Sequence, residues 1–394
     1  MTTDAARAAE VDGHVADGFG PVADAFRANF TDAGEVGAAV AVYAGGELVV
    51  DLWGGTADPA TTSKWRPDTL SVIFSCSKGI VTLCVYALVQ DGLLDLDAPV
   101  ARYWPEFAHN GKQDITVRTA LSHRAGLPTV EAELSFEEVL AWTPVIDALA
   151  AQAPRWKPGT GFFYHALTFG WLAGEVIRRV SGQMPGDFLR SRFTGPLDLD
   201  TWIGLPADKL GRLAPVVDAT LPTDPDVLAE QAVFALTEAA VIGERSVTLD
   251  GALMPPAGSW AAAFNRPAVA QAQLPGGNGI STARGLAGLY SAAVHGPDRF
   301  LRADSVSDAL VVRSEGAPLF GGEAGDRWGT GFVIGTPGAS PLLGPRSFGH
   351  GGAGGKAAFG DDSHDVGFAY LNNWMGTVPD ERASRIITAL AGCL

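Results

Sequence analysis

Cysteine is scarce in this chain of 394 residues, which has three: Cys76, Cys84 and Cys393. The number is odd and no two of them form a C-x-x-C pair, so the sequence indicates neither a disulfide framework nor a zinc site built on cysteines. The seven histidines lack H-E-x-x-H spacing or a comparable metal-binding pattern. We therefore expect no metal ion and no cofactor.

Positive charge is also in short supply, because 28 Lys and Arg stand against 44 Asp and Glu and give a formal net charge of −16. This balance argues against nucleic acid or an anionic membrane surface as a partner. Residues 1–20 have no basic segment followed by an apolar one, which a secretory signal requires. Apolar runs reach about a dozen residues, too few to cross a bilayer. We expect a cytoplasmic protein that acts on a small molecule.

Apolar residues, by contrast, make up 47% of the chain, which excludes an intrinsically disordered protein and supplies a large core. The 49 glycines and 25 prolines predict many loops between the elements of secondary structure. A chain of this length forms one large domain or two closely packed ones.

Strand patterns gather at the two ends of the sequence. Residues 36–44 and 47–55 are short apolar stretches separated by Gly45-Gly46, which predicts a β-hairpin. Residues 56–70 are polar and contain proline, so we expect a loop there. Further strands are predicted for residues 328–335, 346–350 and 365–373.

Helical patterns fill the middle of the chain and flank the strands. The stretch 75–92 predicts one buried helix that ends at Asp91-Gly92, where the glycine adopts the left-handed conformation that closes a helix. A Ser-Thr N-cap opens the helix expected over residues 281–295. The other expected helices cover residues 17–30, 116–122, 135–152, 167–181, 226–240 and 380–394.

This distribution of strands and helices predicts an α+β fold. The N-terminal hairpin would pair with the C-terminal strands in one antiparallel sheet flanked by the terminal helices. We expect a sheet domain formed by residues 1–70 and 270–394, into which a mostly helical domain of residues 71–269 is inserted. Sites often lie between two such domains, so we expect the active site in the cleft between them.

The first candidate for chemistry is the S-x-x-K pattern of Ser75 and Lys78 at the start of a predicted helix. Residues three apart share one face of a helix, so Lys78 lies one turn from the Ser75 hydroxyl. A serine hydroxyl is a weak nucleophile until a base takes its proton, and a lysine can be that base if burial lowers its pKa. The apolar residues after Lys78 predict such burial, and the helix N-terminus offers backbone N–H groups to an oxyanion.

Two later motifs extend this pattern. Residues 164–166, Tyr-His-Ala, match a Y-x-N motif in part, and residues 350–352, His-Gly-Gly, stand where a K-T-G, H-G-G or W-G-G motif would follow. With these motifs the chain resembles serine β-lactamases and penicillin-binding proteins, and most of all the class C β-lactamase-like carboxylesterases, or family VIII esterases. The resemblance runs from about residue 20 to the end and includes residues 121–128 and 275–290.

The resemblance implies a β-lactamase/DD-peptidase-like fold and a serine hydrolase with a Ser-Lys-Tyr catalytic set. Ser75 would be the acylated nucleophile, while Lys78 and Tyr164 would share the proton transfers, and which of the two is the principal base stays open. The backbone N–H groups of Ser75 and Ala353 would form the oxyanion hole. The implied substrate-binding residues are Ala166, His350, Gly351 and Gly352.

Two departures from the lactamase pattern bear on the substrate. In lactamases the Asn of Y-x-N holds the amide of the substrate side chain, and here Ala166 replaces it. The Lys of K-T-G offers a carboxylate a permanent positive charge, whereas His350 is largely neutral near pH 7. Both changes weaken recognition of an anionic lactam and leave acyl transfer intact. We therefore expect a carboxylesterase that hydrolyses short-chain, neutral esters through an acyl-enzyme on Ser75.

The sequence excludes two other interpretations of these residues and leaves several open. An α/β-hydrolase requires a G-x-S-x-G turn, which the sequence lacks, and a P-loop requires Ser or Thr where Ala357 follows Lys356. β-Lactamase, D-amino-acid peptidase or amidase, and acyltransferase activities stay open on the same scaffold, as does a non-catalytic ligand-binding protein. We expect His123 to be structural, and Cys76 to be buried and inert.

Overall fold

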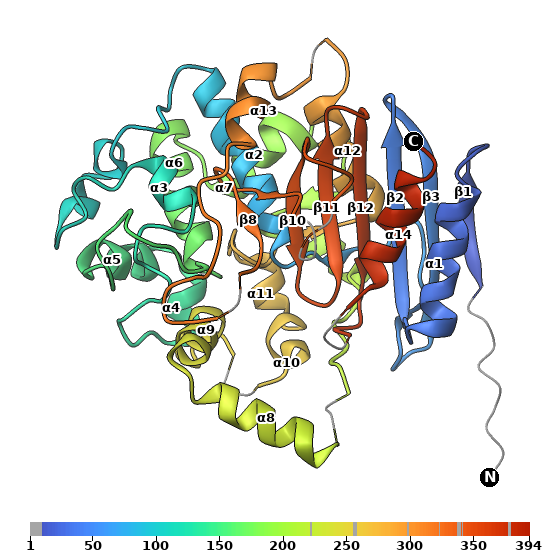
Figure 1. The fold of residues 1–394 in the computed structure, drawn as a ribbon, viewed down its shortest axis with the longest axis horizontal. Helices are drawn as coiled ribbons and strands as arrows, with labels where there is room; N and C mark the ends of the chain where they lie inside the picture. The colour runs from blue at the N-terminus through green and yellow to red at the C-terminus, as the bar shows by residue number, and fades with distance from the viewer. Residues whose placement is uncertain are drawn as a thin grey trace.

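Figure 1 shows the computed structural model, which describes residues 10–220, 223–254, 258–297, 299–322, 324–336, 340, 342–376 and 380–394. Most of its strands form one antiparallel sheet in the order β1-β3-β2-β12-β11-β10-β9-β8, with β4 added beside β3. These strands are β1 (Val11–Val15), β2 (Gly37–Ala44), β3 (Glu47–Asp58), β4 (Ser63–Lys64), β8 (Arg327–Trp328), β9 (Val333–Ile334), β10 (Ser347–Gly352), β11 (Lys356–Asp361) and β12 (Val366–Asn372). A small second sheet joins β5 (Ser71–Val72), β7 (Ile280–Ser281) and β6 (Thr201–Trp202).

Helices surround the large sheet and make up most of the middle of the chain. The α-helices are α1 (Gly20–Asp32), α2 (Cys76–Gln90), α3 (Val117–Leu121), α4 (Phe136–Leu140), α5 (Thr143–Ala151), α6 (Thr168–Ser181), α7 (Pro185–Leu189), α8 (Pro225–Ala235), α9 (Glu238–Thr248), α10 (Trp260–Phe264), α11 (Pro267–Gln271), α12 (Ala283–Val294), α13 (Ala303–Ala309) and α14 (Arg382–Ala391). Short 3-10 helices span Val100–Arg102, Pro105–Ala108 and Ala207–Arg212, and a π-helix spans Arg190–Thr194. No helix of the described residues is both long and apolar enough to span a bilayer.

The two ends of the chain meet at the centre of the large sheet. The hairpin of β2 and β3 turns at Gly45 and Gly46, whose φ angles of +58° and +79° suit glycine. β2 then pairs along its length with β12, from Ala38 opposite Asn372 to Ala44 opposite Val366. The expected pairing of N-terminal and C-terminal strands is therefore present.

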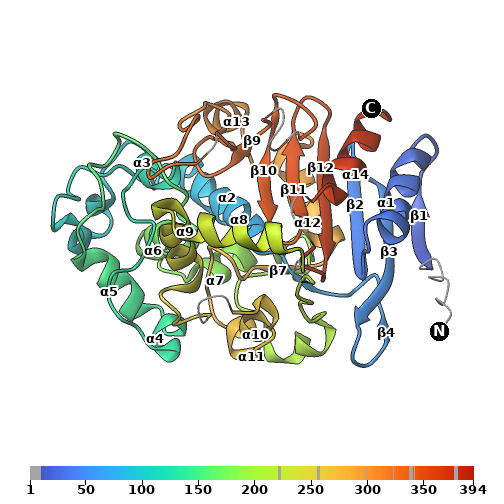
Figure 2. The ribbon, with the colours of Figure 1, turned by 60° about the horizontal axis from the view of Figure 1, so that its bottom comes forward.

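Successive side chains of the sheet point to opposite faces and pack into two separate apolar layers. In β2, Val40 and Val42 pack with Phe26 of α1 and Ile386 of α14 on one face. Ala41 faces the opposite way, into the larger core that includes α12 and α2. Figures 1 and 2 show α1 and α14 side by side on one face of the sheet, with α12 behind the other. The terminal helices thus flank the sheet, as the patterns predict.

Helix α2 is the central element of the helical part. Its residues from Cys76 to Leu88 are buried, and it contacts β10, α6 and α7. It ends at Asp91, followed by Gly92 with φ +72°, as predicted. Because α2 is surrounded on all sides, its first turn is held at a fixed place beside the sheet.

The structure corrects several expectations about strands. The pattern does not predict β1, an edge strand whose middle residues are exposed, nor β11, whose sequence KAAFGD lacks β-branched residues. Residues 56–70, expected to form a loop, contain the end of β3 and all of β4. Residues 328–335, expected to form one strand, split into the ends of β8 and β9 around Gly331, which has φ +83°.

Two expected helices are each divided in two. Residues 135–152 form α4 and α5, which separate at Trp142, where φ is +66°. Residues 226–240 fall in α8 and α9, and α9 begins where the Thr237 hydroxyl accepts the N–H of Ala240. Of the N-terminal stretch in which no secretory signal is expected, residues 1–9 lie outside the described residues.

Candidate active site

Ser75 lies at the N-terminus of α2 in a locally constrained segment. Phe74, immediately before it, has φ +45°, a conformation that costs energy for a residue with a side chain. The Phe74 ring is held edge-on against Trp260 and Phe264, with ring centroids 5.3 and 4.9 Å away. The Ile73 N–H donates to the Gly279 carbonyl at 2.8 Å. These contacts fix the turn from which the Ser75 side chain projects.

Lys78 and Tyr164 converge on the Ser75 hydroxyl. Lys78 Nζ lies 3.2 Å from Ser75 Oγ and donates to the Gly276 carbonyl at 2.6 Å. The Tyr164 hydroxyl donates to Ser75 Oγ at 2.9 Å. The structure therefore brings together all three residues predicted to be catalytic, although Tyr164 lies far from the other two in sequence.

Burial moves the pKa values of the two partners in opposite directions. The Lys78 side chain is fully buried, and loss of hydration lowers its pKa to about 7. Burial raises the pKa of Tyr164 above its ordinary value, and the hydrogen bond to Ser75 offsets only part of this. Near neutral pH, Lys78 can therefore accept a proton, whereas Tyr164 remains a phenol that can donate one.

Tyr164 is positioned by aromatic neighbours. Its ring stacks on Trp328, with 5.2 Å between centroids, and lies 4.9 Å from the His123 ring. His123 Nδ1 accepts the His165 N–H at 3.1 Å, while its Nε2 has no partner among the described residues. No hydrogen bond joins His123 to Ser75. His123 therefore contacts Tyr164 and not Ser75, and its structural role stays a prediction.

The glycine-rich strand β10 runs past the start of α2. A Cβ on Gly352 would lie 2.5 Å from the Ile73 carbonyl oxygen, so glycine permits this close approach. Ala353 follows and lines the same cavity as Ser75. Neither the Ser75 N–H nor the Ala353 N–H donates to another described residue. Two free amides on opposite segments are the arrangement that an oxyanion hole requires.

His350 is buried beside these residues and is neutral. Its Nδ1 donates to the Gly351 carbonyl at 2.5 Å, which leaves Nε2 as an acceptor without a partner among the described residues. Burial and the neighbouring Lys78 lower the pKa of His350 to about 3. The Cys76 thiol donates to the His350 carbonyl at 3.1 Å, and burial raises the pKa of that thiol to about 12. Cys76 is thus buried, as expected, and a raised pKa disfavours the thiolate that would react.

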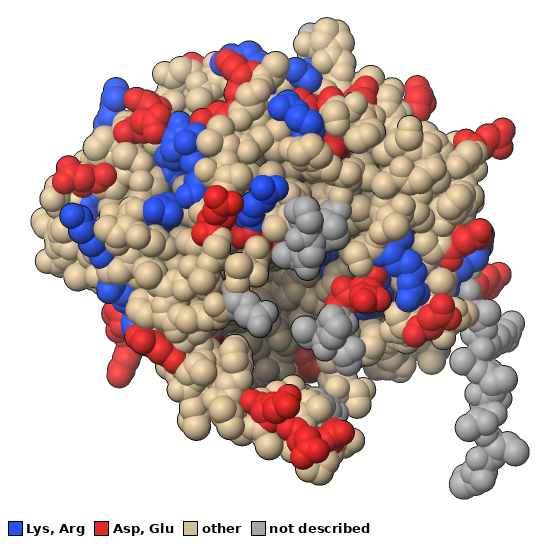
Figure 3. All heavy atoms as spheres, viewed as in Figure 1, with Lys and Arg blue, Asp and Glu red and all other residues tan. Residues whose placement is uncertain are grey.

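A small cavity of about 160 Å³ opens at Ser75. Its lining is mostly apolar and consists of Phe74, Ser75, Tyr164, Ala166, Leu167, Val247, Trp260, Phe264, Gly276, Gly277 and Ala353. Of the predicted substrate-binding residues it includes Ala166, whereas residues 350–352 are not part of this lining. Figure 3 shows that the molecule is hollowed on the face beside α8.

Three kinds of residue at the site escape prediction from the sequence. Trp260 and Phe264 form cavity walls from α10, and Trp328 stacks on Tyr164 from β8. Lys356 is buried behind the Ala353 turn. The ten tryptophans and 19 phenylalanines carry no pattern that separates cavity walls from core. For Lys356, the available signal is its place directly after Gly354-Gly355, close behind the third motif.

The same arrangement of elements occurs in known proteins. A family model described as Beta-lactamase matches residues 22–392. The chain belongs to the β-lactamase family. Esterase/beta-lactamase LipL of Mycobacterium tuberculosis is 33% identical to it over 372 residues, which cover 90% of this chain and 81% of LipL.

Solved structures of this β-lactamase family agree with the sequence match. A family VIII carboxylesterase superposes with a TM-score of 0.85 at 34% identity and covers 98% of this chain and 100% of its own. EstA of Arthrobacter nitroguajacolicus Rue61a superposes with a TM-score of 0.81 at 32% identity, covering 96% and 97%. The predicted family and the predicted α+β, β-lactamase/DD-peptidase-like fold are both confirmed.

Proposed function

We propose that this protein is a serine carboxylesterase that hydrolyses short-chain, neutral esters through an acyl-enzyme on Ser75. The observation that carries the proposal is the Ser75 hydroxyl, shared between Lys78 Nζ and the Tyr164 hydroxyl at the floor of an apolar cavity. The esterase names of the related proteins support the same reaction class.

In the acylation step, neutral Lys78 takes the proton of Ser75 as Oγ forms a bond to the ester carbonyl carbon. The carbonyl oxygen becomes an oxyanion between the N–H groups of Ser75 and Ala353, each worth about 3–4 kcal/mol by analogy with other oxyanion holes. The C–O bond to the alcohol then breaks. The Tyr164 phenol gives its proton to the leaving oxygen and regains one from the Lys78 ammonium.

In the deacylation step, the same groups work on water. Neutral Lys78 accepts a proton from a water molecule as the water oxygen forms a bond to the acyl carbon. The Ser75–acyl bond then breaks, the Tyr164 phenol gives its proton to Ser75 Oγ and regains one from the Lys78 ammonium, and the carboxylic acid leaves. We assign Lys78 as the principal base because its pKa is lowered to about 7, whereas burial raises that of Tyr164.

The surroundings of Ser75 favour a neutral acyl group. Phe74, Trp260 and Phe264 give the cavity an apolar wall, and Ala166 offers it no hydrogen-bond donor. His350 supplies no positive charge because burial keeps it neutral. We propose that the site lies in the cleft between the sheet domain of residues 1–70 and 270–394 and the helical domain of residues 71–269.

β-Lactamase activity is a second candidate, because the name of LipL includes it. A lactam carries a carboxylate that a cation would bind, and neutral His350 is a poor substitute for one. We therefore expect lactams to be slow substrates, with esters preferred.

The proposal is tested by labelling and by a substrate series. A fluorophosphonate should add its mass to the peptide that contains Ser75, and p-nitrophenyl esters should be hydrolysed fastest with short acyl chains. Ser75→Ala should lose both label and turnover while keeping the fold, and Ser307→Ala, on exposed Ser307 of α13, should keep both. Label on another serine would refute the assignment, as would nitrocefin turnover as efficient as that of p-nitrophenyl butyrate.

A further inference from the structure

The turn that carries Ala353 has little rigidity of its own. It joins β10 to β11 through Ala353, Gly354 and Gly355, and both glycines have φ +78°. Glycine has the widest conformational freedom of any residue, so such a turn samples many shapes unless other groups hold it. An oxyanion donor, however, must be fixed before the reaction begins.

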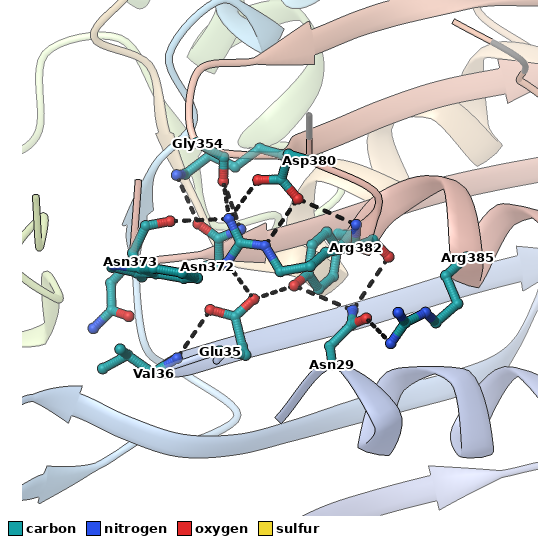
Figure 4. A network of polar contacts seen from close by, with 12 residues as sticks. Asn29, Glu35, Val36, Gly354, Asn372, Asn373, Asp380, Arg382 and Arg385 are labelled. Carbon is teal, nitrogen blue, oxygen red and sulfur yellow. Dashed lines mark hydrogen bonds and ion pairs between the residues drawn. The ribbon is translucent and has the colours of Figure 1, made fainter. Parts of the chain in front are cut away.

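Three buried side chains hold the carbonyl groups of this turn. Lys356 Nζ donates to the Ala353 carbonyl at 3.3 Å and to Asn372 Oδ1 at 2.9 Å. Asn372 Nδ2 donates to the Gly354 carbonyl at 2.8 Å, and Arg382 Nη2 donates to the same oxygen at 2.9 Å. Figure 4 shows Asn372 and Arg382 converging on Gly354. The turn is thus held from behind, on the side away from the cavity.

The far side of this network is fixed in the terminal elements. Arg382, which is 2% exposed, pairs with Glu35 at 2.8 Å and with Asp380 at 2.6 Å (Figure 4). Glu35 lies between α1 and β2 and also accepts a hydrogen bond from the Tyr370 hydroxyl. The network therefore ties the turn to α14, to β12 and to the segment that opens β2.

Lys356 also reaches the other half of the predicted oxyanion hole. Its Nζ lies 4.9 Å from the centroid of the Phe74 ring, and Phe74 immediately precedes Ser75. It forms no hydrogen bond with Ser75, Lys78 or Tyr164. Lys356 is therefore placed between the two segments that supply the amides, without touching the groups that move protons.

We propose that Lys356, together with Asn372 and Arg382, positions the Ala353 amide for the oxyanion. The proposal rests on the esterase function proposed above. Lys356 is a positioning residue, because it acts on the reaction through the carbonyl of Ala353. Its removal should weaken stabilisation of the transition state and leave binding of the ester ground state nearly unchanged.

The decisive variant is Lys356→Met, which keeps the length of the side chain and removes the donor. We expect kcat for a p-nitrophenyl ester to fall by about ten- to a hundredfold, with little change in KM. A loss of this size is expected when an oxyanion-hole donor is moved out of position. The second readout is the kcat/KM ratio between an ester and its thionoester, whose C=S sulfur is a poor acceptor. In Lys356→Met that ratio should fall toward one, because the variant no longer holds the Ala353 N–H in place to bond the ester oxygen.

Lys112→Met is the matched control. Lys112 also has almost no exposed surface and donates to the carbonyls of His109 and Gln152, and it is not part of the cavity lining at Ser75. This variant should keep the wild-type kcat per active site and the wild-type ratio. Active sites are counted with a fluorophosphonate, so that partial unfolding does not pass for lost catalysis. If Lys356→Met does not fold, Asn372→Ala and Arg382→Lys test the same turn through the Gly354 carbonyl.

The outcomes separate the two proposals. A wild-type protein that hydrolyses no ester contradicts the esterase function. If the wild type is active and the folded Lys356→Met variant keeps the ester-to-thionoester ratio, only the positioning role is overturned. The same holds if Lys356→Met does not fold and the Asn372 and Arg382 variants keep that ratio. An equal loss in Lys112→Met would also overturn it, since the effect would then follow from removing any buried lysine.

Discussion

At the scale of single residues, two buried, desolvated lysines shape the site. Lys78 and Lys356 are both buried, and burial lowers the pKa of each to about 7. The sequence predicts the first, because helical spacing alone places it beside Ser75. It does not predict the second, because the partners of Lys356 come from turns and strands that only the tertiary fold brings together.

The first prediction concerns the pH profile of ester hydrolysis. Lys78 must be neutral to accept a proton, so kcat/KM should rise about tenfold per pH unit below pH 7 and level off above it. Tyr164→Phe should lower the plateau by about 10²–10⁴-fold and keep the same inflection. The measurement is initial rates from pH 5 to pH 10 on a p-nitrophenyl ester.

Lys356 has a similar pKa, so a control must separate the two lysines. Lys356→Met should keep the inflection near pH 7, because the titrating base is still present. A wild-type rate that keeps rising tenfold per unit above pH 9 would point to a phenolate base and contradict the role of Lys78. If Lys356→Met loses the inflection, the group that titrates near pH 7 is Lys356, and its attribution to Lys78 is wrong.

At the scale of elements, the site depends on the hairpin of β10 and β11. The sequence predicts a strand over residues 346–350, next to the glycine motif, but not its partner β11. Alanine and glycine in KAAFGD have low strand propensity, and what makes them a strand is pairing with β10 and β12 on both sides. Tertiary pairing therefore decides the shape of the turn that carries Ala353.

Two neighbouring glycines of β10 should respond differently to alanine. In Gly352→Ala the new Cβ would meet the Ile73 carbonyl oxygen at 2.5 Å, so β10 must shift away from the start of α2. We expect a loss of about 1–3 kcal/mol in the free energy of unfolding, with a fall in kcat because the Ala353 amide moves with the strand. Denaturant unfolding and ester kinetics measure the two effects.

Gly351→Ala serves as the control for stability. Its Cβ would have the Lys356 carbonyl oxygen as nearest neighbour at 3.8 Å, an ordinary contact. The free energy of unfolding should therefore change by less than about 0.5 kcal/mol. If both variants lose the same free energy of unfolding, the close approach of β10 to Ile73 is not what makes Gly352 necessary.

At the scale of the whole molecule, the site depends on segments from almost the entire chain. The cavity is lined by residues from Phe74 to Ala353, and the network behind Ala353 extends to Glu35 and Arg382. Strand patterns at both ends of the sequence predict this joining of the termini. The cavity walls are not predictable, because no pattern in the sequence marks Val247 of α9 or Trp260 of α10 as facing Ser75.

The buried histidines link the site to the stability of the whole protein. Burial lowers the pKa of His123 well below its ordinary value, that of His165 to about 4 and that of His350 to about 3. Below pH 6.5 the unfolded chain therefore binds protons that the folded chain does not, and the free energy of unfolding falls as pH falls. Glu35 and Asp326, whose pKa values burial raises, oppose this trend, two groups against the three histidines.

We therefore predict that the protein loses stability between pH 6.5 and about pH 4, by up to about 1.4 kcal/mol per pH unit for each of the three histidines. Denaturant unfolding at several pH values in this window gives the slope. His165→Gln should lower the slope by up to about 1.4 kcal/mol per pH unit, which corresponds to one bound proton. His14→Gln, on an exposed residue of β1, should leave the slope unchanged. A stability that stays constant from pH 6.5 to pH 5 would mean that these imidazoles take up protons in the folded protein, and the neutral state assigned to His350 would then be wrong.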